Sequence, residues 1–145
     1  MSRLRDRLGA FAQLQSPREF ALFASVTAFA SGVPLLLRLP LPRMSRLLTR
    51  PPRTPRRPLS PDRVDRLVAL APRLAHPVVR TGCLTRGLTL YWFLRRQGVA
   101  VELRFGLDPT GVADGHCWLT LDGEPYLERE DPRPRFAEIY RVPVT

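Results

Sequence analysis

Proline is the residue that most constrains this chain, because sixteen prolines occur in 145 residues and many of them fall between residues 34 and 77. Proline lacks a backbone N–H and interrupts both helices and paired strands. The segment from Pro51 to Pro58 reads Pro-Pro-Arg-Thr-Pro-Arg-Arg-Pro, which predicts an extended, exposed linker. It separates a helical, Arg/Pro-rich N-terminal region, residues 1–59, from a second folded region, residues 60–145.

Charge is distributed unevenly along the chain, and all 23 basic residues are arginines. Residues 1–80 contain 15 arginines and 4 acidic residues, a net charge of +11, whereas residues 81–145 contain 8 arginines and 9 acidic residues, a net charge of −1. Such a field attracts acidic peptides, anionic lipid surfaces and nucleic acids alike. We expect no nucleic-acid partner, because no recognition motif or basic stripe with interleaved aromatic residues is present. Contact between the N-terminal half and a membrane surface stays open.

One apolar segment reaches the lower limit of length for a membrane span. Residues 20–37 are 18 residues without a charge, and a spanning helix needs about 20 apolar residues. Gly32 and Pro34 interrupt the second half, so we predict a helix from Pro17 to about Ser31 that is buried or lies at an interface. A membrane span and a secretion signal are the alternatives. A shorter amphipathic stretch follows over residues 38–50.

Two helices are predicted after the linker. The first begins at Ser60-Pro61-Asp62, which combines a capping hydroxyl, a proline at the first helical position and an acid near the positive end of the dipole. Pro72 is expected to kink this helix and Pro77 to stop it. The second runs from about Cys83 to Arg96, ends at Gln97-Gly98, and is too densely apolar for a surface helix. The apolar residues are Val64, Leu67, Val68 and Ala71 in the first helix and Leu84, Leu88, Tyr91, Trp92 and Leu94 in the second.

The remaining pattern is that of an antiparallel sheet. Apolar residues occupy every odd position from Val99 to Leu107, which is the period of a strand. A turn at residues 108–111 precedes a second strand from about His116 to Leu121. Asp122-Gly123 then predicts a tight hairpin into a third strand near Glu124–Glu128. A buried helix followed by antiparallel strands is an α+β arrangement.

Cys83 is the first residue that could carry chemistry, because it lies at the predicted start of the buried helix. The unpaired amides and the helix dipole favour a thiolate there, and the same amides can hold the oxyanion of a tetrahedral intermediate. Gly82 allows a substrate backbone to approach closely. By position alone a free cysteine is more often a packed residue than a nucleophile.

His116 strengthens the case for Cys83. It opens the second strand and shares a face with Trp118 two residues later. A histidine shielded by an indole can act as a general base. Cys117 points to the opposite face and is interpreted as a core residue. Two cysteines are too few for a disulfide framework, and they indicate a reduced, cytoplasmic protein.

An acidic residue that orients His116 is expected on or after the third strand. The candidates are Glu124, Glu128, Glu130 and Asp131. A two-residue loop at Asp122-Gly123 puts Glu128 on the wrong face for the histidine, whereas a three-residue loop puts both Glu128 and Glu130 on the histidine's face. Strand pairing therefore favours Glu128 and Glu130 equally as the acid that orients His116.

Three segments carry a family resemblance. The run from Cys83 to Leu88, continuing over Leu94–Gly98, looks like a nucleophile helix. The strand Val101–Gly106, the segment His116-Cys117-Trp118-Leu119 and the following Asp122–Pro125 are similar to a His-Ala-Trp strand and its hairpin. In this order and spacing, they resemble the transglutaminase-like leader peptidases of lasso-peptide biosynthesis, related to the C-terminal domain of microcin-processing proteins. The apolar N-terminal helix and the linker resemble that family's first half.

The resemblance implies a papain/transglutaminase-like fold with residues 60–145 as the catalytic domain. It implies a Cys-His-Asp triad of Cys83, His116 and an acid twelve residues after the histidine, where this chain has Glu128 instead of aspartate. The implied reaction is removal of the leader from a lasso-peptide precursor through a thioester, without a cofactor. The implied partners are the precursor, a small leader-recognition protein and a cyclase. Cys117 stands where the family usually has alanine.

The same residues also have the atoms for a metal site or a disulfide. A zinc site could draw on His76, Cys83, His116 and Cys117. We expect no metal, because no paired ligand motif is present and adjacent strand residues point apart. A disulfide between the two cysteines is disfavoured in a reduced compartment. Acyl transfer to an amine, and a non-catalytic basic module that binds peptide or membrane, stay open.

Overall fold

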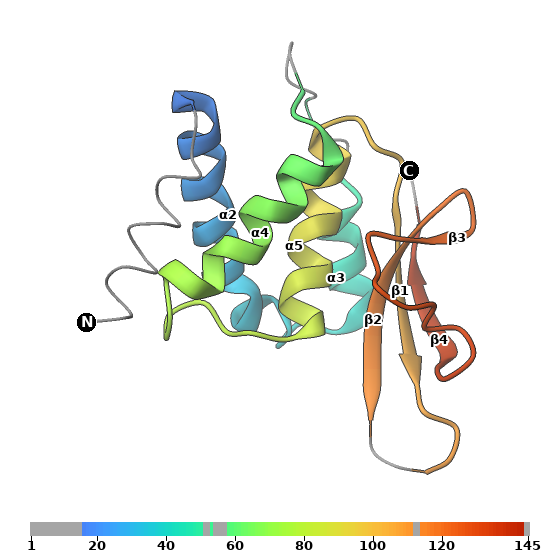
Figure 1. Ribbon diagram of the computed structural model, residues 1–145. Helices are drawn as coiled ribbons and strands as arrows, with labels where there is room; N and C mark the ends of the chain where they lie inside the picture. The colour runs from blue at the N-terminus through green and yellow to red at the C-terminus, as the bar shows by residue number, and fades with distance from the viewer. Residues whose placement is uncertain (1–15, 51–52, 54–57, 112–113, 144–145) are drawn as a thin grey trace.

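The computed structural model describes residues 16–50, 53, 58–111 and 114–143. In these residues four helices precede a four-stranded antiparallel sheet, which confirms the predicted α+β fold (Figure 1). The helices are α2 (Pro17–Leu36), α3 (Leu41–Leu48), α4 (Pro61–Leu74) and α5 (Cys83–Arg96), and the strands are β1 (Glu102–Leu107), β2 (Gly115–Leu121), β3 (Glu124–Tyr126) and β4 (Ala137–Val142). Most of the predicted linker lies outside the described residues.

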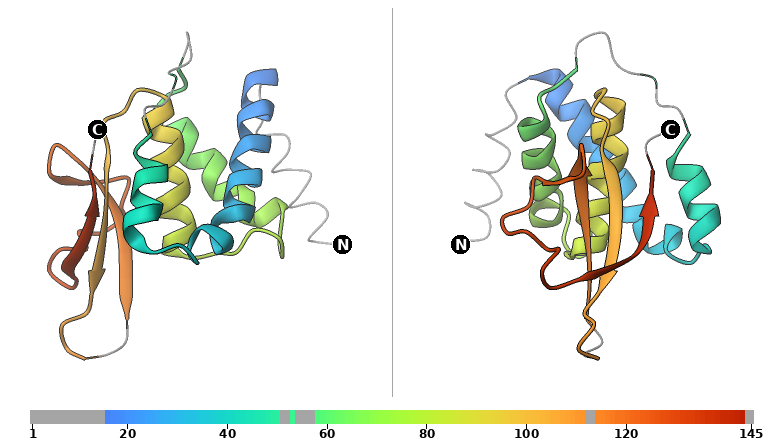
Figure 2. Two further views of the ribbon diagram at one scale, coloured as in Figure 1. Left: turned by 180° about the vertical axis from the view of Figure 1, so that it is seen from behind. Right: turned by 90° about the vertical axis from the view of Figure 1, so that its right-hand side faces the viewer.

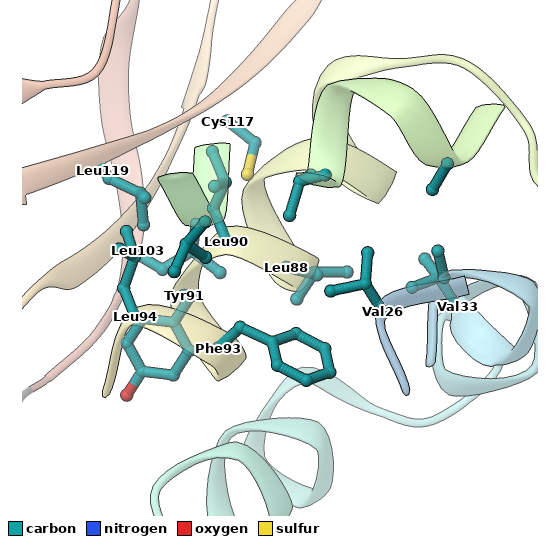
Figure 3. Close-up of a cluster of buried hydrophobic side chains, with 14 of the residues drawn as sticks. Val26, Val33, Leu88, Leu90, Tyr91, Phe93, Leu94, Leu103, Cys117 and Leu119 are labelled. Atoms are coloured by element: carbon teal, nitrogen blue, oxygen red, sulfur yellow. The ribbon is translucent and has the colours of Figure 1, made fainter. Parts of the chain in front are cut away.

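The elements form layers, with α5 between the sheet and the other long helices (Figure 2). One face of the sheet packs on α5 through β1 and β2, and α2 and α4 pack on α5 from the side away from the sheet. In Figure 3, Val26 and Val33 of α2 lie near Leu88 of α5, while Leu103 and Leu119 of the sheet lie near α5 from the other direction. The helix that begins with Cys83 is therefore the centre of the core.

The helix α2 is longer than the sequence predicts. It begins at Pro17, where the Ser16 side chain accepts a hydrogen bond from the Glu19 N–H, and it ends at Leu36, so the expected break near Ser31 is wrong. Pro34 lies in the last turn, where the missing N–H costs a single helical bond, and the bond at the end of the helix, from Leu37 N–H to the Val33 carbonyl, is formed at 2.9 Å.

The buried face of α2 explains this tolerance and bears on the membrane question. Phe23, Val26, Ala30 and Val33 are buried at helical spacing. In the described part of the chain α2 is the one helix long and apolar enough to cross a membrane, a criterion that the core helix of a soluble domain also meets. Glu19 is buried as well, and its Oε2 accepts a hydrogen bond from Arg63 Nη2 of α4 at 2.7 Å. One face of α2 therefore packs in the core, and 28% of its most apolar window is buried.

The two predicted helices after the linker are present. The helix α4 begins after Ser60 and buries Val64, Leu67, Val68 and Ala71 as predicted, but it ends at Leu74, ahead of Pro77. The bounds of α5 agree with the prediction, and its residues from Gly87 to Leu94 are buried with the exception of Trp92. Leu84 departs from the expected core, because its side chain is 37% exposed.

The sheet has the order β3-β2-β1-β4. Leu103 and Phe105 of β1 are buried as predicted, whereas Leu107 is 49% exposed. Figure 1 shows the reason, since the hairpin between β1 and β2 continues past the end of the helical layer. The strand β4, which pairs with β1, was not predicted.

Candidate active site

Cys83 is the first residue of α5 and borders an open cleft. The preceding Gly82 has φ +150°, a backbone conformation that side-chain-bearing residues rarely adopt. The first helical bond of this turn runs from Arg86 N–H to the Gly82 carbonyl at 3.0 Å. The earlier amides therefore have no partner within the helix, and the positive end of the dipole lies at Cys83. Its Sγ is 3.9 Å from the carbonyl oxygen of Gly115, where β2 begins.

His116, the second residue of β2, stacks with two aromatic rings. The centroid of the Trp118 ring is 6.2 Å away, and that of Phe136, from the segment between β3 and β4, is 5.3 Å away. The shared face of His116 and Trp118 agrees with the predicted alternation. The Nε2 atom faces a carboxylate oxygen of Glu128 at 3.4 Å. Nδ1 is then the ring nitrogen left to exchange a proton with a thiol.

Glu128 reaches His116 by a route that strand pairing did not predict. The hairpin has a two-residue loop, with Asp122 and Gly123 at φ 53° and 86° and Leu121 paired with Glu124. That register was expected to put Glu128 on the wrong face, and this expectation is wrong. The strand β3 ends at Tyr126, and Leu127 has φ 57°. A residue in the left-handed region breaks the alternation of a strand, so the next side chain turns back toward the histidine.

Arg86 fixes Glu128 from the opposite side. Its Nη1 donates to Glu128 Oε1 at 3.0 Å, and its Nη2 donates to the Leu127 carbonyl at 2.6 Å and to Asp65 Oδ1 of α4 at 3.1 Å. One guanidinium thus joins α4, the helix that carries Cys83, and the turn that carries Glu128. The two carboxylate oxygens of Glu128 are divided between Arg86 and His116.

The other acidic candidates have different surroundings. Asp131 and Glu124 both accept hydrogen bonds from Arg133. Glu130 borders the cleft and is exposed. Among the hydrogen bonds of the described residues, His116 pairs with Glu128 and with none of the other three candidates.

Cys117 lies on the opposite face of β2 from His116, as predicted. It is buried, and a Cβ atom added to Gly87 would overlap its Sγ. Burial raises the pKa of the Cys117 thiol well above its usual range, and the neighbouring Cys83 and Glu128 add to the increase. Cys117 therefore stays a neutral core thiol.

A cleft of about 880 Å³ brings the three predicted site residues together. Cys83, His116 and Glu128 all border it, and the segment from Leu127 to Phe136 forms one wall. Such a volume accommodates several residues of an extended peptide. A cysteine at a helix start, with a histidine paired to a carboxylate in the same cleft, has the components of nucleophilic catalysis.

Of the four residues with atoms that suit zinc, Cys83, His116 and Cys117 border the cleft and His76 does not. His76 is exposed in the turn after α4, and both cysteines are free. Within the described ranges, no group of three or more histidine, cysteine, aspartate or glutamate side chains is placed to hold a metal ion.

Three residues of the site were missed at the level of sequence. Arg86 had a usable signal, because it follows Cys83 by one helical turn and lies on the same face. Asp65 and Phe136 had none, since each reaches the site only through the tertiary fold.

Comparison with known proteins identifies a family for the chain. A family model described as the transglutaminase-like superfamily matches residues 27–141, and the match begins ahead of the predicted division at residues 59 and 60. The searches of curated proteins and of solved structures found no match. The family match spans most of the chain and contains every residue of the cleft, and the chain therefore belongs to the transglutaminase-like superfamily.

Proposed function

We propose that this protein is a cysteine peptidase that removes the leader from a ribosomally made lasso-peptide precursor. The observation that carries the proposal is the His116–Glu128 pair in the same cleft as a cysteine at a helix start. The resemblance of the Cys83 helix and the His116 strand to lasso-peptide leader peptidases supports the substrate class. Residues 60–145 supply the proposed catalytic groups.

In the first half of the proposed reaction, Cys83 Sγ attacks the carbonyl carbon of the scissile peptide bond. His116 takes the thiol proton, and the amides at the start of α5 stabilise the oxyanion. When the tetrahedral intermediate collapses, the C–N bond breaks and His116 returns the proton to the leaving amine. The leader stays bound to Cys83 as a thioester.

In the second half, His116 takes a proton from water, and the resulting nucleophile attacks the thioester. The C–S bond breaks, the leader leaves with a free carboxylate, and the proton returns to Cys83. An amine in place of water would give acyl transfer through the same thioester. The cleft is open to solvent, so water can reach the thioester.

Glu128 and Arg86 have supporting roles in this mechanism. Glu128 orients the imidazole and stabilises its protonated form, as the acid of a catalytic triad does. Arg86 positions Glu128 by holding its second oxygen and the carbonyl of Leu127. Trp118 and Phe136 restrict rotation of the ring of His116.

The test is to incubate the protein with candidate precursors encoded beside its gene and to weigh the products. Cleavage into leader and core by wild type, with none by Cys83→Ala, supports the proposal. A product joined to an added amine identifies a transferase. Failure to cleave or transfer any precursor in the presence of its leader-recognition protein contradicts it.

We further propose that a separate small recognition protein delivers the leader and that a cyclase closes the ring afterwards. The proposed catalytic groups lie in one fold in which α2, α4 and the sheet all pack on α5, so gripping an extended leader is assigned to a separate protein. A recognition protein that adds the leader as a strand supplies affinity through main-chain hydrogen bonds.

We propose the arginines of residues 1–80 as the docking surface. The net charge of +11 over these residues steers acidic partners, and salt weakens such attraction. Cleavage should be faster with the recognition protein and slower at high salt. Equal rates in all four combinations of salt and recognition protein would contradict this part.

A further inference from the structure

Cys83 borders a second cleft that no step of the proposed mechanism occupies. This cleft has a volume of about 340 Å³. The end of α2 contributes Pro34 and Leu37, the loop before α5 contributes Arg80, and α5 contributes Leu84. We call it the Arg80 cleft. The end of α2 and the loop before α5 border the Arg80 cleft, whereas the start of β2 and the segment from Leu127 to Phe136 border the main cleft, and the described residues that line the two clefts share only Cys83.

The Arg80 cleft combines apolar walls with a single cationic group. Leu37 and Leu84 are 41% and 37% exposed, although the density of apolar residues in α5 predicts that Leu84 is buried. An exposed leucine beside a nucleophile provides a contact for a substrate side chain. Among the described residues that border the cleft, Arg80 carries the only charge. The complementary ligand is an apolar side chain accompanied by a carboxylate.

The chemistry of the reaction decides which part of the substrate lies there. His116 must reach the leaving amine to protonate it, so the residues after the scissile bond extend into the main cleft beside His116. The acyl portion stays attached to Cys83 and extends away from His116. The Arg80 cleft is the second cleft that Cys83 borders.

We propose that the Arg80 cleft binds the leader residues immediately before the scissile bond and selects an apolar residue preceded by an acidic one. Leu84 is adjacent to Cys83 and contacts the residue at the bond, whereas Arg80 lies farther back and pairs with the carboxylate of the residue before it. This inference rests on the proposed function, because it uses the same nucleophile and the same direction of the substrate.

The test uses peptidyl chloromethyl ketones, which report the acyl-side subsite without requiring hydrolysis. The Cys83 thiolate displaces chloride and forms a thioether, and the adduct is followed by mass spectrometry. Three acetylated probes are compared, with the sequences Glu-Leu, Lys-Leu and Glu-Gly before the ketone. Glu-Leu should modify Cys83 about tenfold faster than Lys-Leu, because attraction to Arg80 is replaced by repulsion. It should also react faster than Glu-Gly.

Two variants and two matched controls assign these preferences to the cleft. Arg80→Glu should reverse the order of Glu-Leu and Lys-Leu, and Leu84→Ser should remove most of the advantage of Leu over Gly. Arg141→Glu in β4 and Leu47→Ser in α3 change exposed residues by the same chemistry and should preserve both ratios.

The outcomes separate this inference from the proposed function. An unchanged order in Arg80→Glu, or equal rates for all three probes, overturns the subsite even if wild type cleaves a precursor. Reversal in Arg80→Glu supports the subsite even if no precursor is cleaved. Failure of every probe to modify Cys83 faster than a free cysteine overturns both.

Discussion

Arg86 and Glu128 form a hydrogen bond of 3.0 Å that connects the helix of the candidate nucleophile to the carboxylate beside the candidate base. The longer side chain of glutamate makes the connection possible, because one oxygen meets Arg86 while the other faces His116. A side chain one methylene shorter could not span both partners from the same backbone position. The glutamate at this position, where the resembling peptidases have aspartate, is therefore matched to its surroundings.

The first prediction concerns the length of this side chain. Glu128→Asp should lower kcat by about 10²-fold, since misplacing a catalytic unit by about 1 Å has effects of that size. Glu128→Gln should retain measurable activity, because orienting a base matters less than supplying the nucleophile. Steady-state cleavage of a precursor measures both, and Glu130→Gln is the control. Loss of activity in Glu130→Gln with a tolerant Glu128 would reassign the acid.

The second prediction tests Arg86 as a positioning residue. Arg86→Lys keeps the charge but cannot donate to Glu128, Leu127 and Asp65 in the same fork geometry. The variant should lower kcat with little change in KM, and guanidinium ion should partly rescue Arg86→Ala. Arg66→Lys, at an exposed position of α4, is the matched control. Normal kcat in Arg86→Lys would show that these three contacts of Arg86 are not needed for catalysis.

The third prediction follows from the buried thiol of Cys117. Burial raises its pKa, so the folded state binds the proton more tightly than the unfolded state does. The stabilisation is complete below the ordinary pKa of 9.0 and is lost as the pH rises above that value. The free energy of unfolding should therefore fall above pH 9, by at most about 1.4 kcal/mol per pH unit from this group.

Urea denaturation between pH 8 and pH 10 measures this slope. Cys117→Ala, which removes the buried thiol, should reduce it. The same slope in wild type and Cys117→Ala would contradict the prediction.

The fourth prediction concerns the packing of α5 on β2. A Cβ atom at Gly87 would overlap Cys117 Sγ, so Gly87→Ala should destabilise the protein by about 1–3 kcal/mol. Gly32→Ala is the matched control, because nothing lies within 4 Å of its added Cβ, and it should stabilise α2 by about 0.5–1 kcal/mol. Combining Gly87→Ala with Cys117→Ala should recover part of the loss. Denaturant titration that shows equal effects for the two glycines would refute this packing.

The parts of the fold that the sequence predicts best are those with strong periodicity. The density of apolar residues predicts α5, and the strict alternation of apolar residues predicts β1. Asp122-Gly123 predicts the hairpin between β2 and β3. The strand β4 was missed because it lies at an edge of the sheet, and its apolar Ile139 is 57% exposed, so its pattern is weak. The length of α2 was missed because burial of Val33 outweighs the local effect of Pro34.

Parts of the candidate site could likewise be predicted from the sequence, and one part could not. Cys83 and His116 follow from their places at the start of a helix and of a strand. Glu128 could not be distinguished from Glu130 by pairing, because the outcome depends on the left-handed conformation of Leu127, a residue with no local preference for it. The acid was suggested by family resemblance, and its contact with His116 depends on the tertiary fold.

The central claim is that Cys83 forms a thioester with the leader, and intact mass spectrometry of the protein during turnover tests it most directly. Wild type mixed with a precursor and stopped in acid should carry an adduct of leader mass that maps to Cys83. His116→Ala and Cys83→Ala should lack the adduct and lose about 10³-fold or more in cleavage without additive effects, while Cys117→Ala should resemble wild type. Cleavage by Cys83→Ala, or an adduct that maps to Cys117, would contradict the account.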